Sequence, residues 1–164
     1  MPEALESIGQ YAFNQCSSIT EVTIPANTSK IGAYAFYLEY WVDNKLIHTK
    51  IDGNISYTTT NNIEELRGCI EGLKAIKNKS IKLEVHLDSA YVLNGITQWI
   101  NGWLKNGWKN SKKQDVANKE LWLEVLNEKN KFSDIEFIKV KGHSGEVGNE
   151  KVDEWLNAIM DTPF

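Results

Sequence analysis

The sequence contains few of the residues that mark specialised classes of protein. Its 164 residues include two cysteines, Cys16 and Cys69, and three prolines, and no apolar run approaches the roughly 20 residues of a membrane span. Two cysteines supply neither a disulfide framework nor the spacing of a metal site. The N-terminus also lacks the basic and then apolar segments of a secretion signal. We therefore expect a cytoplasmic protein that has no association with a membrane.

The chain also lacks the net positive charge that is common in proteins that bind nucleic acids. Its formal net charge is −4, and its mean hydropathy of −0.40 is ordinary for a globular domain. Between residues 101 and 119, however, five lysines accompany a single acid, Asp115, and alternate with Trp103 and Trp108. Such a segment can hold a phosphate backbone. The alternative is a solvated helix face beside core tryptophans.

Apolar patterning predicts an α/β domain with a sheet covered by helices. Strands are expected at Ile19–Ile24, Ala33–Trp41, Lys45–Lys50, Ile81–Leu87 and Ile135–Val140. Helices are expected from about Ile63 to Ile76, in short pieces over Tyr91–Trp103 that are broken at glycines, at Val116–Glu128 and at Glu150–Met160. Asn61 or Asn62 is a candidate N-cap for the first helix, and Cys69 is expected in the core.

The N-terminal part contains one internal repeat, because Ile8–Phe13 (IGQYAF) returns as Ile31–Phe36 (IGAYAF). The stretch from Ala4 to Phe36 resembles the leucine-rich repeats of bacterial surface antigens. A single repeat of this kind cannot bury its own apolar face, so it must pack on the rest of the chain. We therefore divide the chain into a repeat-like segment, residues 1–31, and a main domain, residues 32–164.

Three carboxylates lie where a predicted helix or strand meets a loop: Glu65, Asp88 and Asp153. Asp88 follows the strand Ile81–Leu87 at its carboxyl end, where the ligand sites of α/β sheets gather. Clustered acids of this kind can hold the metal ions of a phosphodiesterase. Helix-capping and surface acids are the competing interpretation, because a chain with 22 acids always has some near loops.

Four sequence motifs favour the metal-binding interpretation of these carboxylates over the capping one. They are Thr59–Leu66 (TTNNIEEL), Leu87–Val92 (LDSAYV), Gly95–Ile100 (GITQWI) with Trp103 and Gly107–Lys109 (GWK), and Val140–Gly145 (VKGHSG) followed by Asn149-Glu150 and Asp153-Glu154. In this order, from Gly32 to about Ala158, the chain resembles type 1 ribonuclease H. The resemblance implies a ribonuclease H-like fold, with a mixed five-stranded sheet and helices on both of its faces.

The resemblance also implies a role for each matching residue. Glu65, Asp88 and Asp153 would be catalytic and would bind two Mg²⁺ or Mn²⁺ ions, and His143 would assist proton transfer or product release. The substrate, an RNA–DNA hybrid, would be bound by residues of three motifs and the lysine-rich protrusion: Thr60, Asn61, Asn62, Ser89, Trp99, Trp103, Lys105, Trp108, Lys109 and Asn149. Taken as residues alone, the tryptophans and Trp122 are better explained by packing than by base stacking.

The chain departs from the family at its first strand, which normally ends in Asp-Gly-Ser. Here no aspartate precedes Asp43, and the corresponding region reads EVTIP, residues Glu21–Pro25. We expect Ile19–Ile24 to supply a substitute first strand, with Glu21 as the only nearby carboxylate. Loss of the first aspartate predicts weakened activity.

The sequence therefore predicts a monomeric, metal-dependent endonuclease that hydrolyses the RNA strand of RNA–DNA hybrids. Three alternatives stay open. The chain could be a hybrid-binding module without catalysis, a fragment of a repeat-containing interaction protein, or a chimeric reading frame that was never selected as a unit.

Overall fold

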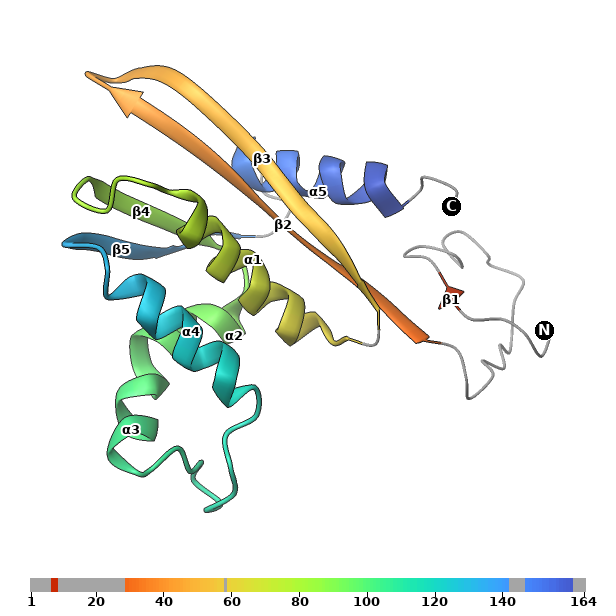
Figure 1. The fold of residues 1–164 in the computed structure, drawn as a ribbon, viewed down its shortest axis with the longest axis vertical. Helices are drawn as coiled ribbons and strands as arrows, with labels where there is room; N and C mark the ends of the chain where they lie inside the picture. The colour runs from red at the N-terminus through yellow and green to blue at the C-terminus, as the bar shows by residue number, and fades with distance from the viewer. Residues whose placement is uncertain (1–6, 9–28, 58, 142–146, 161–164) are drawn as a thin grey trace.

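The computed structural model describes residues 7–8, 29–57, 59–141 and 147–160. Its strands are β1 (Ser7–Ile8), β2 (Ser29–Val42), β3 (Lys45–Tyr57), β4 (Lys82–Leu87) and β5 (Asp134–Lys139). Its helices are α1 (Asn61–Ala75), α2 (Ala90–Asn94), the π-helix η1 (Gly95–Trp99), α3 (Ile100–Lys105), α4 (Lys119–Lys129) and α5 (Val147–Met160). The α/β class expected from the sequence is confirmed (Figure 1).

The hairpin of β2 and β3 is the longest feature of the fold (Figure 1). Its turn residues Asp43 and Asn44 have φ values of 50° and 60°, which is the backbone of the two-residue turns that match strand twist. The strands pair antiparallel from Val42↔Lys45 to Ile31↔Tyr57. The turn was expected, but both strands are longer than the sequence predicted.

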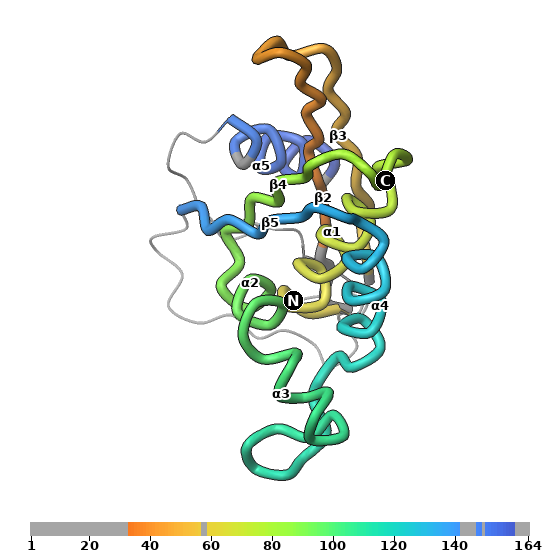
Figure 2. Tube along the Cα trace, turned by 90° about the vertical axis from the view of Figure 1, so that its left-hand side faces the viewer, coloured from red at the N-terminus to blue at the C-terminus, as the bar shows by residue number. Residues whose placement is uncertain are grey.

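Helix α1 packs on one face of the hairpin and α5 packs on the other. A Cβ added to Gly72 of α1 would lie 3.3 Å from the Phe36 side chain, whereas a Cβ on Gly148 of α5 would lie 3.3 Å from Tyr37. Because neighbouring residues of a strand point to opposite faces, these two contacts place the helices on opposite sides of β2. Figure 2 shows the same arrangement.

The N-cap of helix α1 lies one residue before the two asparagines that the sequence offered for that role. Thr60 is the N-cap, and its side chain accepts a hydrogen bond from the Ile63 backbone N–H at 3.4 Å, so neither Asn61 nor Asn62 has that role. The predicted apolar stripe is confirmed, because Leu66, Ile70 and Leu73 are at most 2% exposed. Cys69 is buried beside them, as expected.

The helices α2, η1 and α3 follow one another without the predicted breaks at Gly95 and Gly102, whereas the break predicted at Gly107 is confirmed, since α3 ends at Lys105. Gly95 has helical backbone angles and begins a π-helical turn, and Gly102 lies inside α3. These helices and α4 enclose a cluster of aromatic rings, in which Trp122 is fully buried and Tyr91 lies 5.2 Å from it between ring centroids. The packing interpretation of the tryptophans holds for Trp122 and for Trp108, which is 9% exposed.

Two of the predicted helix starts were wrong. Helix α4 begins at Lys119 and not at Val116, because Asn118 before it has a left-handed backbone. Helix α5 begins at Val147, three residues before the predicted Glu150. Among the helices that the structure describes, none is long and apolar enough to cross a membrane.

The strands form two hydrogen-bonded sets and not one continuous sheet within the described residues. One set has the order β1-β2-β3 and the other pairs β4 with β5 in parallel, from Lys82↔Asp134 to Leu87↔Lys139. Parallel and antiparallel pairs both occur, so the expected mixture of strand directions is confirmed, whereas the continuity of the sheet is not. Among the side chains whose burial the structure describes, the fully buried ones come from the helices α1, α2 and α4.

Candidate active site

The three carboxylates singled out in the sequence line one groove. Asp88 follows β4 directly, Glu65 lies in the second turn of α1, and Asp153 lies in the middle of α5. All three belong to the wall of a groove of about 2300 Å³ between β2 and β4. The fold therefore brings together three acids that are separated by 23 and 65 residues in the sequence.

The electrostatics of the groove are concentrated on Glu65. Although part of its side chain is exposed, its pKa is raised from 4.5 to about 7. Burial among its neighbours is the main cause, the negative charges of Asp88 and Asp153 add to it, and Lys139 opposes it. The negative charges of Asp88 and Asp153 thus lie close enough to oppose the ionisation of Glu65. A cation bound between them would relieve this repulsion.

Lys139 is a functional candidate that the sequence analysis missed. It ends β5 opposite Leu87 of β4, and its ammonium donates to the backbone carbonyl oxygen of Asp88. The lysine therefore holds a positive charge beside the carboxylates. Its signal in the sequence was weak, because a lysine at the end of a strand usually points to solvent.

The carboxylates fit a magnesium or manganese ion by chemistry, since both metals take hard oxygen ligands. The effect of Asp88 and Asp153 on Glu65 supports this fit, because both negative charges raise the pKa of Glu65 and a bound cation would oppose them. Within the described part of the chain, no three histidine, cysteine or acidic side chains are already gathered closely enough to hold a metal ion. Metal ligation would therefore require these carboxylates to draw together.

Some predicted site residues lie outside the described residues. These are His143, in the segment 142–146, and Glu21, in the segment 9–28. Asn149 lies in the first turn of α5, but its side chain is not among those that the structure describes. Their predicted roles stay predictions.

The N-terminus of α1 carries the predicted hybrid-binding residues Thr60, Asn61 and Asn62, all exposed. A buried network holds this end in place. Glu64, whose side chain is 5% exposed, accepts hydrogen bonds from the Thr59 hydroxyl at 2.5 Å and from Arg67 at 2.8 Å. Glu64 and Arg67 were not singled out in the sequence, where consecutive glutamates at a helix start indicate only helix-dipole stabilisation.

The lysine-rich protrusion is exposed, as a nucleic-acid contact requires. Lys105 ends α3, and Lys109 follows it but already pairs with Asp115 at 2.6 Å. Trp99 is 37% exposed, whereas Trp103 packs against the core. Lys105 can therefore contact a phosphate without first breaking an ion pair that the structure describes, whereas Lys109 cannot. Ser89 caps α2 by accepting from Val92 N–H at 3.3 Å.

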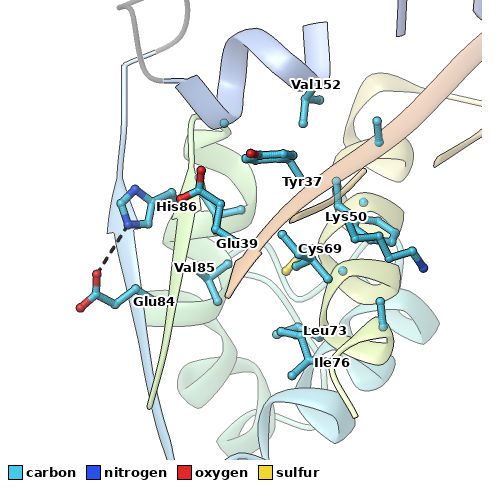
Figure 3. A pocket seen from close by; sticks show the side chains of 18 of the residues that line it. Tyr37, Glu39, Lys50, Cys69, Leu73, Ile76, Glu84, Val85, His86 and Val152 are labelled. Carbon is cyan, nitrogen blue, oxygen red and sulfur yellow. Dashed lines mark ion pairs between the residues drawn. The ribbon is translucent and has the colours of Figure 1, made fainter. Parts of the chain in front are cut away.

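Cys69 faces the groove from α1 together with Leu73 and Ile76 (Figure 3). Burial and, as a smaller cause, the negative charge of Glu65 together raise the pKa of its thiol to about 12. The thiol therefore stays protonated and weakly nucleophilic at neutral pH, which is consistent with a packing residue.

Comparison with known proteins gives a consistent result. The family model described as RNase H matches residues 22–159. A ribonuclease H of Hydrogenovibrio crunogenus is 50% identical over 103 residues, covering 63% of this chain and 70% of that protein. A ribonuclease H of Clostridium botulinum is 43% identical over 132 residues, covering 80% of this chain and 84% of that protein.

Solved structures show the same similarity. The crystal structure of LC9-RNase H1, a type 1 RNase H with the type 2 active-site motif, matches with a TM-score of 0.65 and 25% identity over 85% of this chain and 74% of that chain. A foamy viral protease-reverse transcriptase in complex with RNA/DNA hybrid matches with a TM-score of 0.58 and 16% identity, covering 84% of this chain and 21% of that chain. The latter likeness concerns the fold alone.

Proposed function

Because the chain belongs to the ribonuclease H family, we propose that it is a metal-dependent endonuclease that hydrolyses the RNA strand of RNA–DNA hybrids. The observation that carries this proposal is the convergence of Glu65, Asp88 and Asp153 on one groove. The products would carry 5′-phosphate and 3′-hydroxyl ends. We further propose that the protein acts as a monomer in the cytoplasm.

Each part of the site has a defined task in this proposal. Glu65, Asp88 and Asp153 would hold two Mg²⁺ or Mn²⁺ ions, which supply an activated water and stabilise the leaving oxygen when bound. Glu65 would also contact the ribose 2′-hydroxyl, the group that distinguishes RNA from DNA. Lys139 would favour the ionised form of Glu65, because its positive charge lowers the pKa of that carboxyl.

Substrate binding would rely on shape and phosphates. Thr60, Asn61 and Asn62 are exposed at the start of α1, close in sequence to Glu65, and would contact the minor groove of the hybrid. Ser89 and Asn149 would contribute near the carboxylates, and the protrusion would bind the backbone through Lys105 and Lys109, with Trp99, Trp103 and Trp108 supporting them. His143 would move a proton or assist product release.

Activity would be weaker than in a site with a fourth carboxylate. The family's first aspartate has no counterpart before Asp43 in this chain, and the described acids alone do not form a closed metal cluster. Fewer negative charges bind metal ions less tightly. Glu21 is the one acid near the expected position.

A second function, hybrid binding without catalysis, is favoured by the same lack of a closed metal cluster among the described residues. It would keep the exposed α1 terminus and the protrusion. A third, in which residues 1–31 are a leucine-rich-repeat-like interaction segment, rests on the repeat IGQYAF and IGAYAF alone.

Cleavage of an end-labelled RNA–DNA hybrid, with Mg²⁺ and with Mn²⁺, tests the proposal. Asp88→Asn should abolish cleavage, because it removes a ligand charge at the carboxyl end of β4. Asp134→Asn is the matched control, since Asp134 is exposed at the opposite end of the paired strands. Absence of cleavage with both metals, together with intact hybrid binding in a gel-shift assay, would refute the nuclease and support the binding module.

A further inference from the structure

Three Asn-Gly pairs lie in the segment that contains α2, η1 and α3: Asn94-Gly95, Asn101-Gly102 and Asn106-Gly107. Asparagine followed by glycine is the pair that deamidates most readily without an enzyme, because glycine has no Cβ to hinder its backbone nitrogen. In this reaction the glycine nitrogen attacks the side-chain amide carbon of the asparagine. The attack requires an N–H without a hydrogen bond, a backbone that can rotate, and access of water.

The first two pairs are protected by helices. Gly95 is buried, and its N–H donates to two carbonyl oxygens of the preceding helical turn. The side-chain oxygen of Asn94 also accepts a hydrogen bond from the Gln98 amide at 3.3 Å. Asn101 and Gly102 both lie within α3, which holds their backbone in the helical conformation. Attack on either asparagine would therefore require the helix to unwind locally.

The third pair lies where α3 ends. Asn106 is the C-cap of the helix, Gly107 follows it with a φ of 62°, and both residues are exposed. The Trp108 N–H donates to the Trp103 carbonyl oxygen at 2.7 Å, a hydrogen bond that commonly closes a helix at a glycine. Among the hydrogen bonds that join described residues, none is donated by the Gly107 N–H and none involves the Asn106 side chain. Both reacting groups are thus accessible.

A negative charge at this position would change the lysine-rich protrusion, residues 101–119 (Figure 1). Lys105 directly precedes Asn106 and Lys109 lies three residues after it, so a carboxylate here would stand between two proposed phosphate contacts. The protrusion contains five lysines and one acid, and a second acid would reduce its excess of positive charge. The carboxylate would repel the phosphates of a nucleic acid and compete with them for the two lysines.

We propose that Asn106 is a site of spontaneous deamidation, through which the protrusion loses positive charge and hybrid affinity as the protein ages. The Gly107 backbone nitrogen bonds to the side-chain amide carbon of Asn106, and ammonia leaves with the proton that this nitrogen gives up. Water then opens the cyclic imide at one of its two carbonyl carbons, which yields aspartate or isoaspartate. Water is the co-reactant, and no group is oxidised or reduced.

The two products would differ in their effect on packing. Aspartate changes the charge and leaves the length of the backbone unchanged. Isoaspartate adds a methylene group to the backbone between α3 and Gly107, directly before Trp108. The Trp108 side chain is 9% exposed, and its ring lies 6.2 Å from that of Trp103 between centroids. Isoaspartate should therefore also loosen the packing of Trp108.

Peptide mapping by mass spectrometry tests the modification itself. Full-length protein is incubated in a mildly alkaline buffer, which accelerates the attack, and the three Asn-Gly pairs are followed in the same sample. Asn94 and Asn101 are the internal controls, because they have the same following residue. We expect Asn106 to deamidate at least about tenfold faster than either, because each control must first unwind part of a helix. Equal rates at the three asparagines, or no deamidation at Asn106, would overturn the proposal.

Fluorescence anisotropy with a labelled hybrid tests the consequence, which rests on the proposed function. Aged unchanged protein and fresh Asn106→Asp should bind about threefold more weakly than fresh unchanged protein, because a unit charge about 7 Å from a phosphate in water costs about that factor. Asn106→Gln is the matched control, since its longer side chain closes a ring much more slowly, and its affinity should survive ageing.

The outcomes separate the modification from the proposed function. Protein that is deamidated at Asn106 and still binds the hybrid as tightly as fresh protein would overturn the loss of affinity. Aged Asn106→Gln that weakens as much as the aged unchanged protein would overturn it as well. Absence of hybrid binding by fresh protein would refute the proposed function, while the peptide map would still decide whether Asn106 is the modified residue.

Discussion

Adding a methyl group at Gly95 tests the packing of the helical layer. A Cβ at this position would lie 2.0, 2.5 and 2.7 Å from three ring carbons of Trp122, all far inside van der Waals contact. Trp122 is fully buried, and Tyr91 and Trp103 lie 5.2 and 5.3 Å from it between ring centroids, so the ring has no free space into which to move. The Gly95→Ala change must therefore displace η1 from α4.

Two effects of opposite sign determine the size of the change. Gly95 has φ −56° and ψ −51°, so alanine fits its backbone and gains about 0.5–1 kcal/mol in helix propensity. Overpacking a tight core costs about 1–3 kcal/mol, and a contact of 2.0 Å places Gly95→Ala at the upper end. We expect a net loss of about 2–2.5 kcal/mol in the free energy of unfolding, or a fall of about 4–10 °C in Tm for a chain of this size.

Gly102→Ala is the matched control, because it adds the same methyl group to a helical glycine that has nothing within 4 Å. It should raise stability by about 0.5–1 kcal/mol through helix propensity alone. Urea unfolding followed by circular dichroism measures both variants. Equal stability of Gly95→Ala and Gly102→Ala would refute the packing of Gly95 against Trp122.

Three further predictions concern the groove and the protrusion. Glu65 has a pKa of about 7 in the folded protein and an ordinary value of 4.5, so the metal-free protein should lose stability as the pH rises from about 4.5 to about 7. The affinity for Mn²⁺, measured by calorimetry, should rise through pH 7. Glu65→Gln should remove both pH dependences, and a stability that does not change with pH in the unchanged protein would contradict the assignment. Lys139→Gln should move the midpoint of the Mn²⁺ affinity profile to higher pH, because Lys139 lowers the pKa of Glu65, whereas Lys82→Gln at the far end of β4 should leave it in place. Lys105→Ala should reduce the salt dependence of hybrid binding by about one phosphate contact in a titration by fluorescence anisotropy. Lys109→Ala should reduce it less, because Lys109 already pairs with Asp115. If Lys105→Ala and a Lys45→Ala control at the hairpin tip gave the same salt dependence, the protrusion would be excluded as a phosphate-binding element.

The sequence predicted the helices best where a single apolar stripe decides the structure. The spacing of Leu66, Ile70 and Leu73 predicted α1 because one face of that helix is fully buried. The cap was misplaced because threonine and asparagine are both good caps, and only the backbone shows which residue lies outside the helix. The start of α4 depends on the left-handed backbone of Asn118, which apolar periodicity does not report.

The strands were harder to predict because their burial is incomplete. The end of β3, from Ile51 to Tyr57, contains glycine and asparagine and lacks clean alternation, so its pairing with β2 had no signal in the sequence. The division into two hydrogen-bonded sets depends on tertiary pairing and could not be read from local pattern. The π-helical turn at Gly95 is equally a product of packing, since it fits the helix against Trp122.

For the candidate site, the sequence predicted which carboxylates line one groove, because their motifs fix their places near the start of α1, directly after β4 and within α5. It did not predict Lys139, whose importance arises only when parallel pairing brings the end of β5 beside Asp88. Nor did it predict the link from Glu64 to Thr59 and Arg67, because a buried glutamate is distinguished from an exposed one only by its surroundings.

The aromatic cluster gives the molecule a built-in optical reporter of one of its halves. Tyr91, Trp99, Trp103, Trp108 and Trp122 all lie in the helical layer, linked by ring centroid distances of 5.2–6.2 Å. Trp41 lies instead on the hairpin and is 53% exposed. Because near-ultraviolet circular dichroism depends on fixed aromatic packing, the contribution of this cluster to that signal should report the melting of the helical layer. The quenchable emission that a Trp41→Phe variant loses should report on the hairpin. The two halves of the fold can therefore be followed by intrinsic probes without an added label.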